Sequence, residues 1–110
     1  MGLTKTAIFS SEQNQLAVML KAIAHPARLA ILQHIIASDT CICGELVSQL
    51  SLAQATISQH LKELKKAGLI KGSIEGASVC YCIDPDAWKK LKDHLDELFN
   101  SYRNIDQGCC

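Results

Sequence analysis

The sequence has few aromatic residues and no long hydrophobic run. Aromatic residues make up 5% of the 110 positions, whereas hydrophobic residues make up 48%. A core poor in aromatics is built from leucine, isoleucine, alanine and valine, so we expect a mainly α-helical domain. No stretch reaches the roughly 20 apolar residues that a membrane helix needs, and the N-terminus lacks the regions of a signal peptide. We therefore expect a soluble, cytoplasmic protein.

The sequence also lacks net charge, because 11 basic and 11 acidic residues cancel. The charges are nevertheless unevenly distributed. Residues 53–72 carry four lysines and one glutamate, whereas residues 84–106 carry six acids and four bases. This asymmetry lets a neutral protein present a cationic surface to phosphate groups, although a charged cluster is more often only a solvated face.

Cysteine is abundant, with six residues in the chain. In a reducing compartment, clustered cysteines more often bind metals or sense redox state than form structural disulfides. The sequence contains no C-x-x-C motif and no nucleophile and base at a recognisable spacing. We therefore expect that the protein is not an enzyme.

The spacing of apolar residues predicts five helices and one hairpin. Ser10 and Gln13 can form a capping box at the start of the first helix, which runs to about Ala24. His25 and Pro26 separate it from the second helix. The other predicted elements are a short helix over 45–50, a turn at 51–52, a helix over 53–67, a hairpin with its turn at 75–78, and a last helix that begins at Asp84 and Pro85.

This order of elements, α-α-α-α-β-β-α, predicts a winged helix-turn-helix fold, mainly α with a small β-hairpin wing (α+β). We expect a single domain over residues 1–110, with a flexible, cysteine-containing tail at 104–110. The apolar stripes of the first and last helices have no obvious partner in so small a core. They are therefore expected to pair across a two-fold axis in a homodimer.

Three stretches of the sequence resemble the ArsR/SmtB family of bacterial metal-sensing repressors, and the likeness spans about residues 16–99. LKAIAHPARLAIL looks like the entry into the second helix of that family. LAQATISQHLKELKKAGLI resembles its recognition helix, and TCICGEL resembles its arsenic-sensing branch. The resemblance implies a repressor that binds operator DNA without a tightly bound cofactor and releases it on binding an inducer.

In the arsenic-sensing branch, a C-x-C pair stands at the start of the helix before the recognition helix, as Cys41 and Cys43 do here. The resemblance implies these two cysteines as ligands of As(III), Sb(III) or another soft metal ion. Such ions take thiolates, and trivalent arsenic ideally takes three. Leu46 stands where a third cysteine often follows, so Cys109 or Cys110 on the tail is the candidate third ligand.

Alternatives to this site are open at the level of sequence. Cys41 and Cys43 could instead be small apolar residues that pack against a helix start. Cys80 and Cys82 share one face of the predicted hairpin, where strand packing is expected rather than a role in binding. Paired, accessible cysteines would make the protein a redox or persulfide sensor, and a repressor that responds to Cd, Zn or Pb is a further alternative.

The polar face of the helix over 53–67 is the expected DNA-reading surface, although it could be merely solvated. Side chains of this size and polarity read base edges or hold phosphates, and the lysines supply salt-sensitive phosphate contacts. The candidate DNA-binding residues are Gln54, Thr56, Ser58, Gln59, His60, Lys62, Lys65 and Lys71. The expected partner is double-stranded operator DNA, with no membrane partner.

Overall fold

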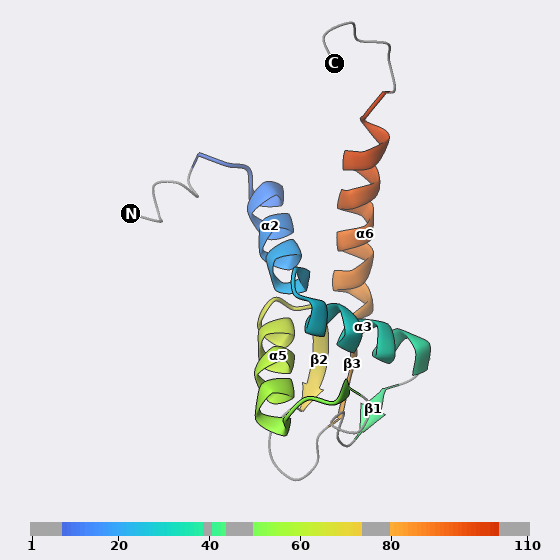
Figure 1. Ribbon diagram of the computed structural model, residues 1–110. Helices are drawn as coiled ribbons and strands as arrows, with labels where there is room; N and C mark the ends of the chain where they lie inside the picture. The colour runs from blue at the N-terminus through green and yellow to red at the C-terminus, as the bar shows by residue number, and fades with distance from the viewer. Residues whose placement is uncertain (1–7, 39–40, 44–49, 74–79, 104–110) are drawn as a thin grey trace, which may run out of the picture.

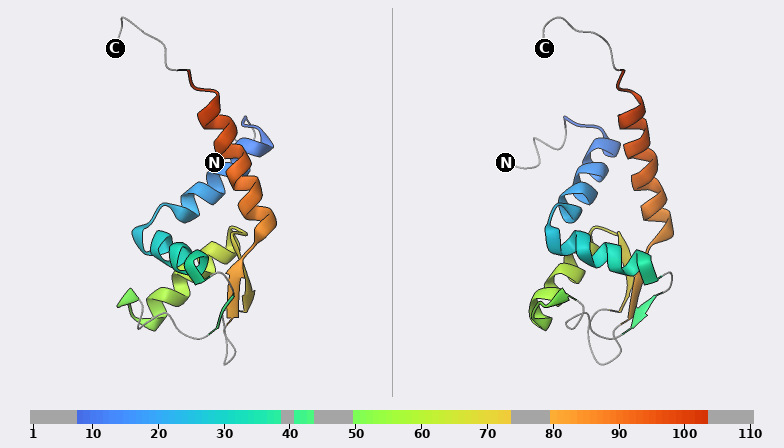
Figure 2. Two further views of the ribbon diagram at one scale, coloured as in Figure 1. Left: turned by 90° about the vertical axis from the view of Figure 1, so that its right-hand side faces the viewer. Right: turned by 45° about the vertical axis from the view of Figure 1, so that its right-hand side comes forward.

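The computed structural model describes residues 8–38, 41–43, 50–73 and 80–103. Along the chain they form α2 (Ser11–Ile23), α3 (Pro26–Ser38), β1 (Ile42–Cys43), α5 (Gln54–Lys66), β2 (Ile70–Ser73), β3 (Cys80–Ile83) and α6 (Pro85–Asn100). Helices α3 and α5 and the sheet form one body, from which α2 and α6 project in the same direction (Figures 1 and 2). The fold is a winged helix-turn-helix, as predicted.

None of the described helices is by itself long and apolar enough to cross a membrane. Helices α2 and α3 together pass this test on length and composition, but they are bent by 93° at the break between them.

The helix ends follow the capping signals in the sequence. Ser10 forms the predicted capping box, because its Oγ accepts from the Gln13 N–H at 3.0 Å and its own N–H donates to Gln13 Oε1 at 2.9 Å. Asp84 caps α6 by accepting from two backbone N–H groups of the first turn. Gly68 ends α5 with a φ of 84°, a conformation that glycine adopts without steric cost. The predicted boundaries of α2, α5 and α6 are therefore confirmed.

The core lies where α3, α5 and the sheet meet. Its largest fully buried side chains are aliphatic with one exception, namely Ile31, Ile57, Leu64, Leu69, Ile70 and Tyr81. Burial of each such side chain is worth roughly 1.5–3 kcal/mol. This composition agrees with a core poor in aromatics, and it fixes α5 against the sheet that forms the wing.

The sheet has three antiparallel strands in the order β1-β3-β2. Pairing of β2 with β3 confirms the predicted hairpin, whose turn at 75–78 lies outside the described residues. Strand β1 was not predicted, because the residues around Ile42 were expected at a helix start. That expectation is wrong: Ile42 pairs with Tyr81 of β3 and packs, partly buried, against the core. Residues 44–49, which hold most of the expected short helix, lie outside the described residues.

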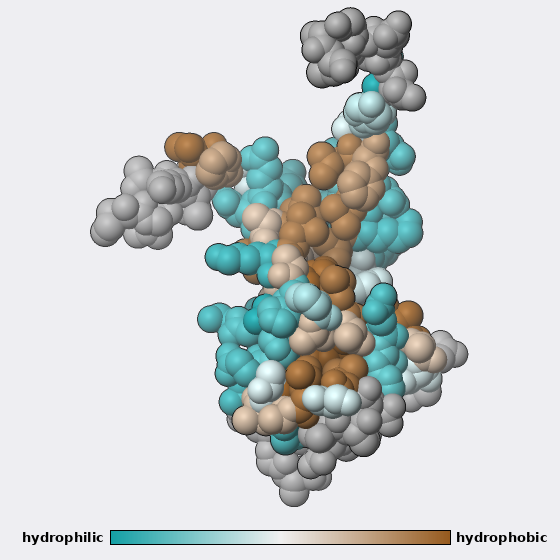
Figure 3. Space-filling model, viewed as in Figure 1, coloured by the Kyte–Doolittle hydropathy of each residue, from teal (hydrophilic) through white to brown (hydrophobic). Residues whose placement is uncertain are grey.

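Large apolar side chains remain exposed on α2, on α6 and at the outer side of α3. Figure 3 shows apolar surface along α6 where this helix faces α2. The exposed large hydrophobic residues are Ile8, Phe9, Val18, Leu20, Leu29, Ile36, Leu98, Phe99 and Tyr102. A single chain therefore leaves much of the apolar surface of its two projecting helices in contact with water.

Two glycines with positive φ provide a matched test of the wing. Gly72 has a φ of 124°, and a Cβ there would collide with the backbone carbonyl of Cys80; Gly68 has a φ of 84° and no described atom within 4 Å of such a Cβ. Gly68→Ala is therefore expected to lower the free energy of unfolding by about 1–2 kcal/mol through backbone strain alone. Gly72→Ala should cost at least about 1 kcal/mol more, because overpacking adds to the strain. Urea denaturation measures both, and equal losses would contradict the described register of β2 and β3.

Candidate DNA-binding face and cysteine site

The outer side of α5 carries most of the side chains that the sequence assigned to DNA. Ile57, Leu61 and Leu64 bury the inner side of this helix in the core. The side chains that are left exposed or partly exposed on the outer side are Gln54, Thr56, Ser58, Gln59 and Lys62. The amphipathic pattern of the helix therefore positions a continuous polar face without further support.

Hydrogen bonds one helical turn apart order this face. Gln54 Nε2 donates to Ser58 Oγ at 3.2 Å, and Gln59 Nε2 donates to Glu63 Oε2 at 3.2 Å. Both bonds are exposed, so base edges can replace them at little net cost. The amide groups of Gln54 and Gln59 therefore both bond along the exposed side of α5.

The candidate phosphate-binding lysines lie on two elements, α5 and β2. Lys65 Nζ donates to the Gly72 carbonyl oxygen at 2.7 Å and so links α5 to β2. Lys71 is exposed on β2 itself. Two cations therefore lie beside the polar face: Lys71 on the wing, and Lys65, which links the wing to α5. Phosphate contacts on either side of a helix that reads bases require such cations.

His60 is the exception among the predicted residues. It is 9% exposed and lies on the buried side of α5. Arg28 Nε donates to His60 Nδ1 at 3.1 Å, and the His25 ring lies 4.5 Å from the His60 ring, centroid to centroid. The expectation that His60 faces DNA with its neighbours is therefore corrected. Its spacing of three residues after Ile57 is the signal that could have placed it inside.

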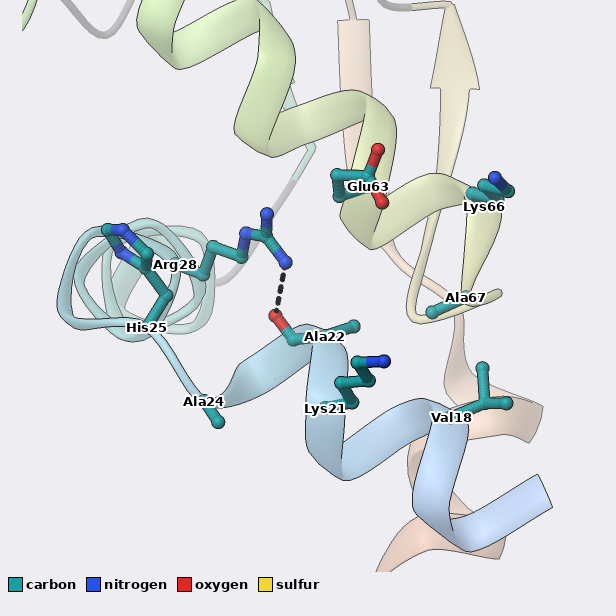
Figure 4. A pocket seen from close by; sticks show the side chains of 9 residues that line it. All are labelled: Val18, Lys21, Ala22, Ala24, His25, Arg28, Glu63, Lys66 and Ala67. Carbon is teal, nitrogen blue, oxygen red and sulfur yellow. Dashed lines mark hydrogen bonds between the residues drawn. The ribbon is translucent and has the colours of Figure 1, made fainter. Parts of the chain in front are cut away.

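A cleft of about 590 Å³ adjoins this cluster between α2, α3 and α5 (Figure 4). In this view Arg28 reaches from α3 toward α2, where its Nη1 donates to the Ala22 carbonyl oxygen at 3.2 Å. The charged side chains that line the cleft include Lys21, Arg28, Lys66 and the acid Glu63. Arg28, which the sequence did not single out, thus connects α2, α3 and α5.

The cysteines lie on the other side of the sheet. Cys41, just before β1, forms a disulfide with Cys82 of β3, and the two Cα atoms are 4.4 Å apart. Cys80 is disulfide-bonded as well, and in the backbone register its neighbour on β1 is Cys43. The expectation that Cys80 and Cys82 serve only strand packing is therefore wrong. Nothing in the sequence indicates that residues 42–43 form a strand that pairs with the hairpin. The two C-x-C pairs were therefore not expected to lie next to each other.

Strand geometry explains why these cysteines meet. Side chains alternate between the two faces of a strand, so Cys80 and Cys82 share one face of β3 while Tyr81 points to the other. Tyr81 is 1% exposed, and burial raises its pKa to about 12. Its hydroxyl has no hydrogen-bond partner in the described part of the chain. The core side of β3 is thus largely apolar, and Cys80 and Cys82 lie on its other, partly exposed side.

Within the described ranges, no three His, Cys, Asp or Glu side chains are arranged as a ready metal site. The sulfurs of Cys41 and Cys82 are instead bonded to each other. The candidate third ligands Cys109 and Cys110 lie outside the described residues. In the structure Cys41, Cys80 and Cys82 are therefore disulfide-bonded, at the junction of β1 with the wing.

Comparison with known proteins gives a consistent picture. A family model described as a helix-turn-helix domain matches residues 23–72. An HTH-type transcriptional regulator of Methanocaldococcus jannaschii is 39% identical over 83 residues, which cover 74% of this chain and 92% of the relative. The HTH-type transcriptional repressor SmtB of Mycobacterium tuberculosis is 43% identical over 76 residues, 69% of this chain but only 50% of that protein. The arsenical resistance operon repressor of Staphylococcus xylosus is 28% identical over 95 residues, 86% of each protein.

Solved structures agree with these relatives. HlyU from Vibrio cholerae matches with a TM-score of 0.63 and 32% identity, covering 86% of this chain and 98% of the other. An ArsR family transcriptional regulator matches with a TM-score of 0.67 over 86% of this chain and all of the other; at 22% identity it supports the fold alone. These neighbours are DNA-binding transcriptional regulators and not enzymes.

The buried histidine makes stability depend on pH. Burial lowers the pKa of His60 below 6.5, and the positive charges of His25 and Arg28 lower it further. Just below pH 6.5, about the pKa of an unperturbed histidine, His60 takes up a proton in the unfolded chain but stays neutral in the folded chain. The free energy of unfolding therefore decreases as the pH drops toward the pKa of His60 in the folded state.

We therefore expect the unfolding temperature to fall between pH 7.5 and pH 5.5, and this fall to be smaller in His60→Gln, which keeps an acceptor for Arg28. His94→Gln, a change at a partly exposed position on α6, is the matched control and should keep the wild-type slope. Thermal unfolding followed by circular dichroism measures all three proteins. The same slope in His60→Gln and wild type would show that His60 does not carry the effect.

Proposed function

Because the chain belongs to the ArsR/SmtB family of helix-turn-helix transcriptional regulators, we propose that it is a repressor that releases operator DNA when a thiophilic inducer binds its cysteines. The inducer we favour is As(III) or Sb(III). The observation that carries this proposal is the grouping of cysteines where β1 meets the wing, in the sheet whose strand β2 contacts α5, the helix that presents the candidate DNA-binding face.

The DNA-binding part of the proposal rests on α5. This helix enters the major groove with Gln54, Thr56, Ser58 and Gln59 toward base edges. Lys62 on the same helix and Lys71 on the wing contact phosphates, and Lys65 holds the wing at the correct distance through its bond to Gly72. A polar helix face flanked by cations is the chemistry that this role requires.

The exposed apolar surface supports a homodimer. Monomeric proteins rarely leave large contiguous apolar patches in water. Leu98, Phe99 and Tyr102 on or just after α6 are each more than half exposed, as is Val18 on α2. We propose that a second copy covers these side chains, which would place two α5 helices on successive turns of a pseudo-palindromic operator.

The inducer part rests on the ligand chemistry. Trivalent arsenic and antimony are soft and prefer thiolate ligands. Cys41 and Cys43 are the ligands we propose first. The Staphylococcus xylosus relative is named a repressor of an arsenical resistance operon, which makes As(III) the first inducer to test.

A redox sensor is the second candidate, because Cys41 and Cys82 form a disulfide in the structure. In that case oxidation, and not an ion, would change the affinity for DNA. The two functions differ in whether fully reduced protein responds to arsenite.

The dimer is tested on α6. Leu98→Glu with Phe99→Glu places two charges in the proposed interface, whereas Lys89→Ala changes an exposed residue on the same helix. We expect the double variant to be monomeric by light scattering and to lose at least tenfold in DNA affinity, with the control unchanged. A dimeric double variant would place the interface elsewhere.

Release is tested with a duplex that the reduced protein selects from a random library. We expect arsenite to weaken the binding of wild-type protein to this duplex by roughly 10–100-fold, within the usual range of allosteric coupling. Cys41→Ser should bind the duplex with nearly wild-type affinity but release it much less, because serine offers no thiolate. Fluorescence anisotropy measures both.

Peroxide is the comparison arm of this experiment. If arsenite leaves reduced wild-type protein on the duplex while peroxide releases it, the redox sensor is correct and the arsenite proposal is wrong.

A further inference from the structure

We infer that the wing completes the inducer site: Cys80 or Cys82 of β3 supplies the third thiolate beside Cys41 and Cys43, so that a single ion bridges β1 and the wing. The inference rests on the proposed function for its biological meaning, but the site itself can be tested without DNA. It replaces the tail cysteines 109 and 110 as the source of the third thiolate.

The backbone places these four cysteines together. Cys41 and Cys82 are close enough to form a disulfide, with Cα atoms 4.4 Å apart. Cys43 is directly opposite Cys80 in the register of β1 and β3. Cys80 and Cys82 share one face of β3 and are two residues apart, which corresponds to roughly 7 Å along a strand. Metal–sulfur bonds of about 2.3 Å therefore reach from both strands to one ion.

The surroundings also favour this site. Cys41 is exposed and Cys82 is partly buried, so a small ion can enter from solvent. Lys71 on β2 is directly opposite Cys82 in the register, and directly opposed residues of an antiparallel pair lie on the same face. A nearby ammonium group favours the anionic thiolate that a soft ion requires.

The ligands must first be reduced. A dithiol reductant donates two electrons and two protons to each disulfide and is itself oxidised to a disulfide, which leaves two protein thiols. Arsenous acid, As(OH)₃, then forms three As–S bonds as three As–O bonds break. The three thiol protons combine with the three hydroxides and leave as water. The disulfide in the structure is thus the form that excludes the ion.

This placement links the ion to the DNA-binding surface. Lys71, a proposed phosphate contact, belongs to the strand beside β3, and Gly72 next to it accepts the hydrogen bond from Lys65 of α5. An ion that draws β1 and β3 together acts directly on the strand pair that positions the wing against α5.

The test compares two variants that each remove two cysteines. Cys80→Ser with Cys82→Ser removes the wing thiols, and Cys109→Ser with Cys110→Ser removes the tail thiols. All proteins are full-length and fully reduced. Isothermal titration with arsenite measures affinity, and X-ray absorption counts the sulfur neighbours of arsenic.

We expect wild type and the tail variant to bind arsenite with affinities within threefold of each other and to show three sulfur neighbours. The wing variant should bind at least 30-fold more weakly and show two. A second wing variant, Cys80→Val with Cys82→Val, also removes both thiols but keeps side chains that favour a strand. It should bind arsenite as weakly as the serine variant. Circular dichroism checks that both variants are folded, so that loss of ligands is distinguished from misfolding. Wild-type affinity in the wing variant, or its loss in the tail variant, would overturn the inference.

The experiments distinguish a wrong placement of the ion site from a wrong repressor mechanism. If arsenite binds through the wing thiols but leaves the DNA complex intact, the site is correct and the repressor mechanism is wrong. If the wild-type protein releases DNA with arsenite while the wing variant responds equally well, the mechanism is correct and this site is wrong.

Discussion

Pairing of β1 with β3 is the constraint on which the rest of this structure depends. It turns a two-stranded wing into a three-stranded sheet and brings residues 41 and 82, far apart in sequence, within disulfide distance. The same pairing sends Ile42 and Tyr81 toward the core and leaves Cys41 exposed and Cys82 partly exposed. Without it, the C-x-C segment and the wing would be two independent features of the molecule.

A second set of contacts fixes α5, the helix that we propose binds DNA. Arg28 of α3 bonds to His60 of α5 and to the backbone of α2, so the three helices share one polar connection within an aliphatic core. Lys65 then links α5 to the wing. Strand β3 is thus connected to α5 through β2 and the bond between Lys65 and Gly72, which is the path that the proposed coupling uses.

Local signals in the sequence were sufficient for most of the fold. The Ser10 capping box, Gly68 and Asp84 set helix ends by interactions within a few residues, and they were predicted correctly. Strand β1 was missed because two residues carry no periodicity, and its stability comes from β3, which is distant in sequence. His60 was misplaced although its spacing after Ile57 indicates the buried side of α5; its bond to the partly buried Arg28, 32 positions away, had no signal in the sequence. The outer face of α5 was predictable because it follows from helical spacing alone.

Thermodynamic linkage provides the most direct test of the central claim, that ion binding at the β1–β3 junction and DNA binding at α5 oppose each other. The measurement is the arsenite affinity of the reduced protein, free and bound to its selected duplex. If the two sites are coupled, DNA must weaken arsenite binding by the same factor by which arsenite weakens DNA binding. Equal arsenite affinities for the free and the DNA-bound protein would contradict the account.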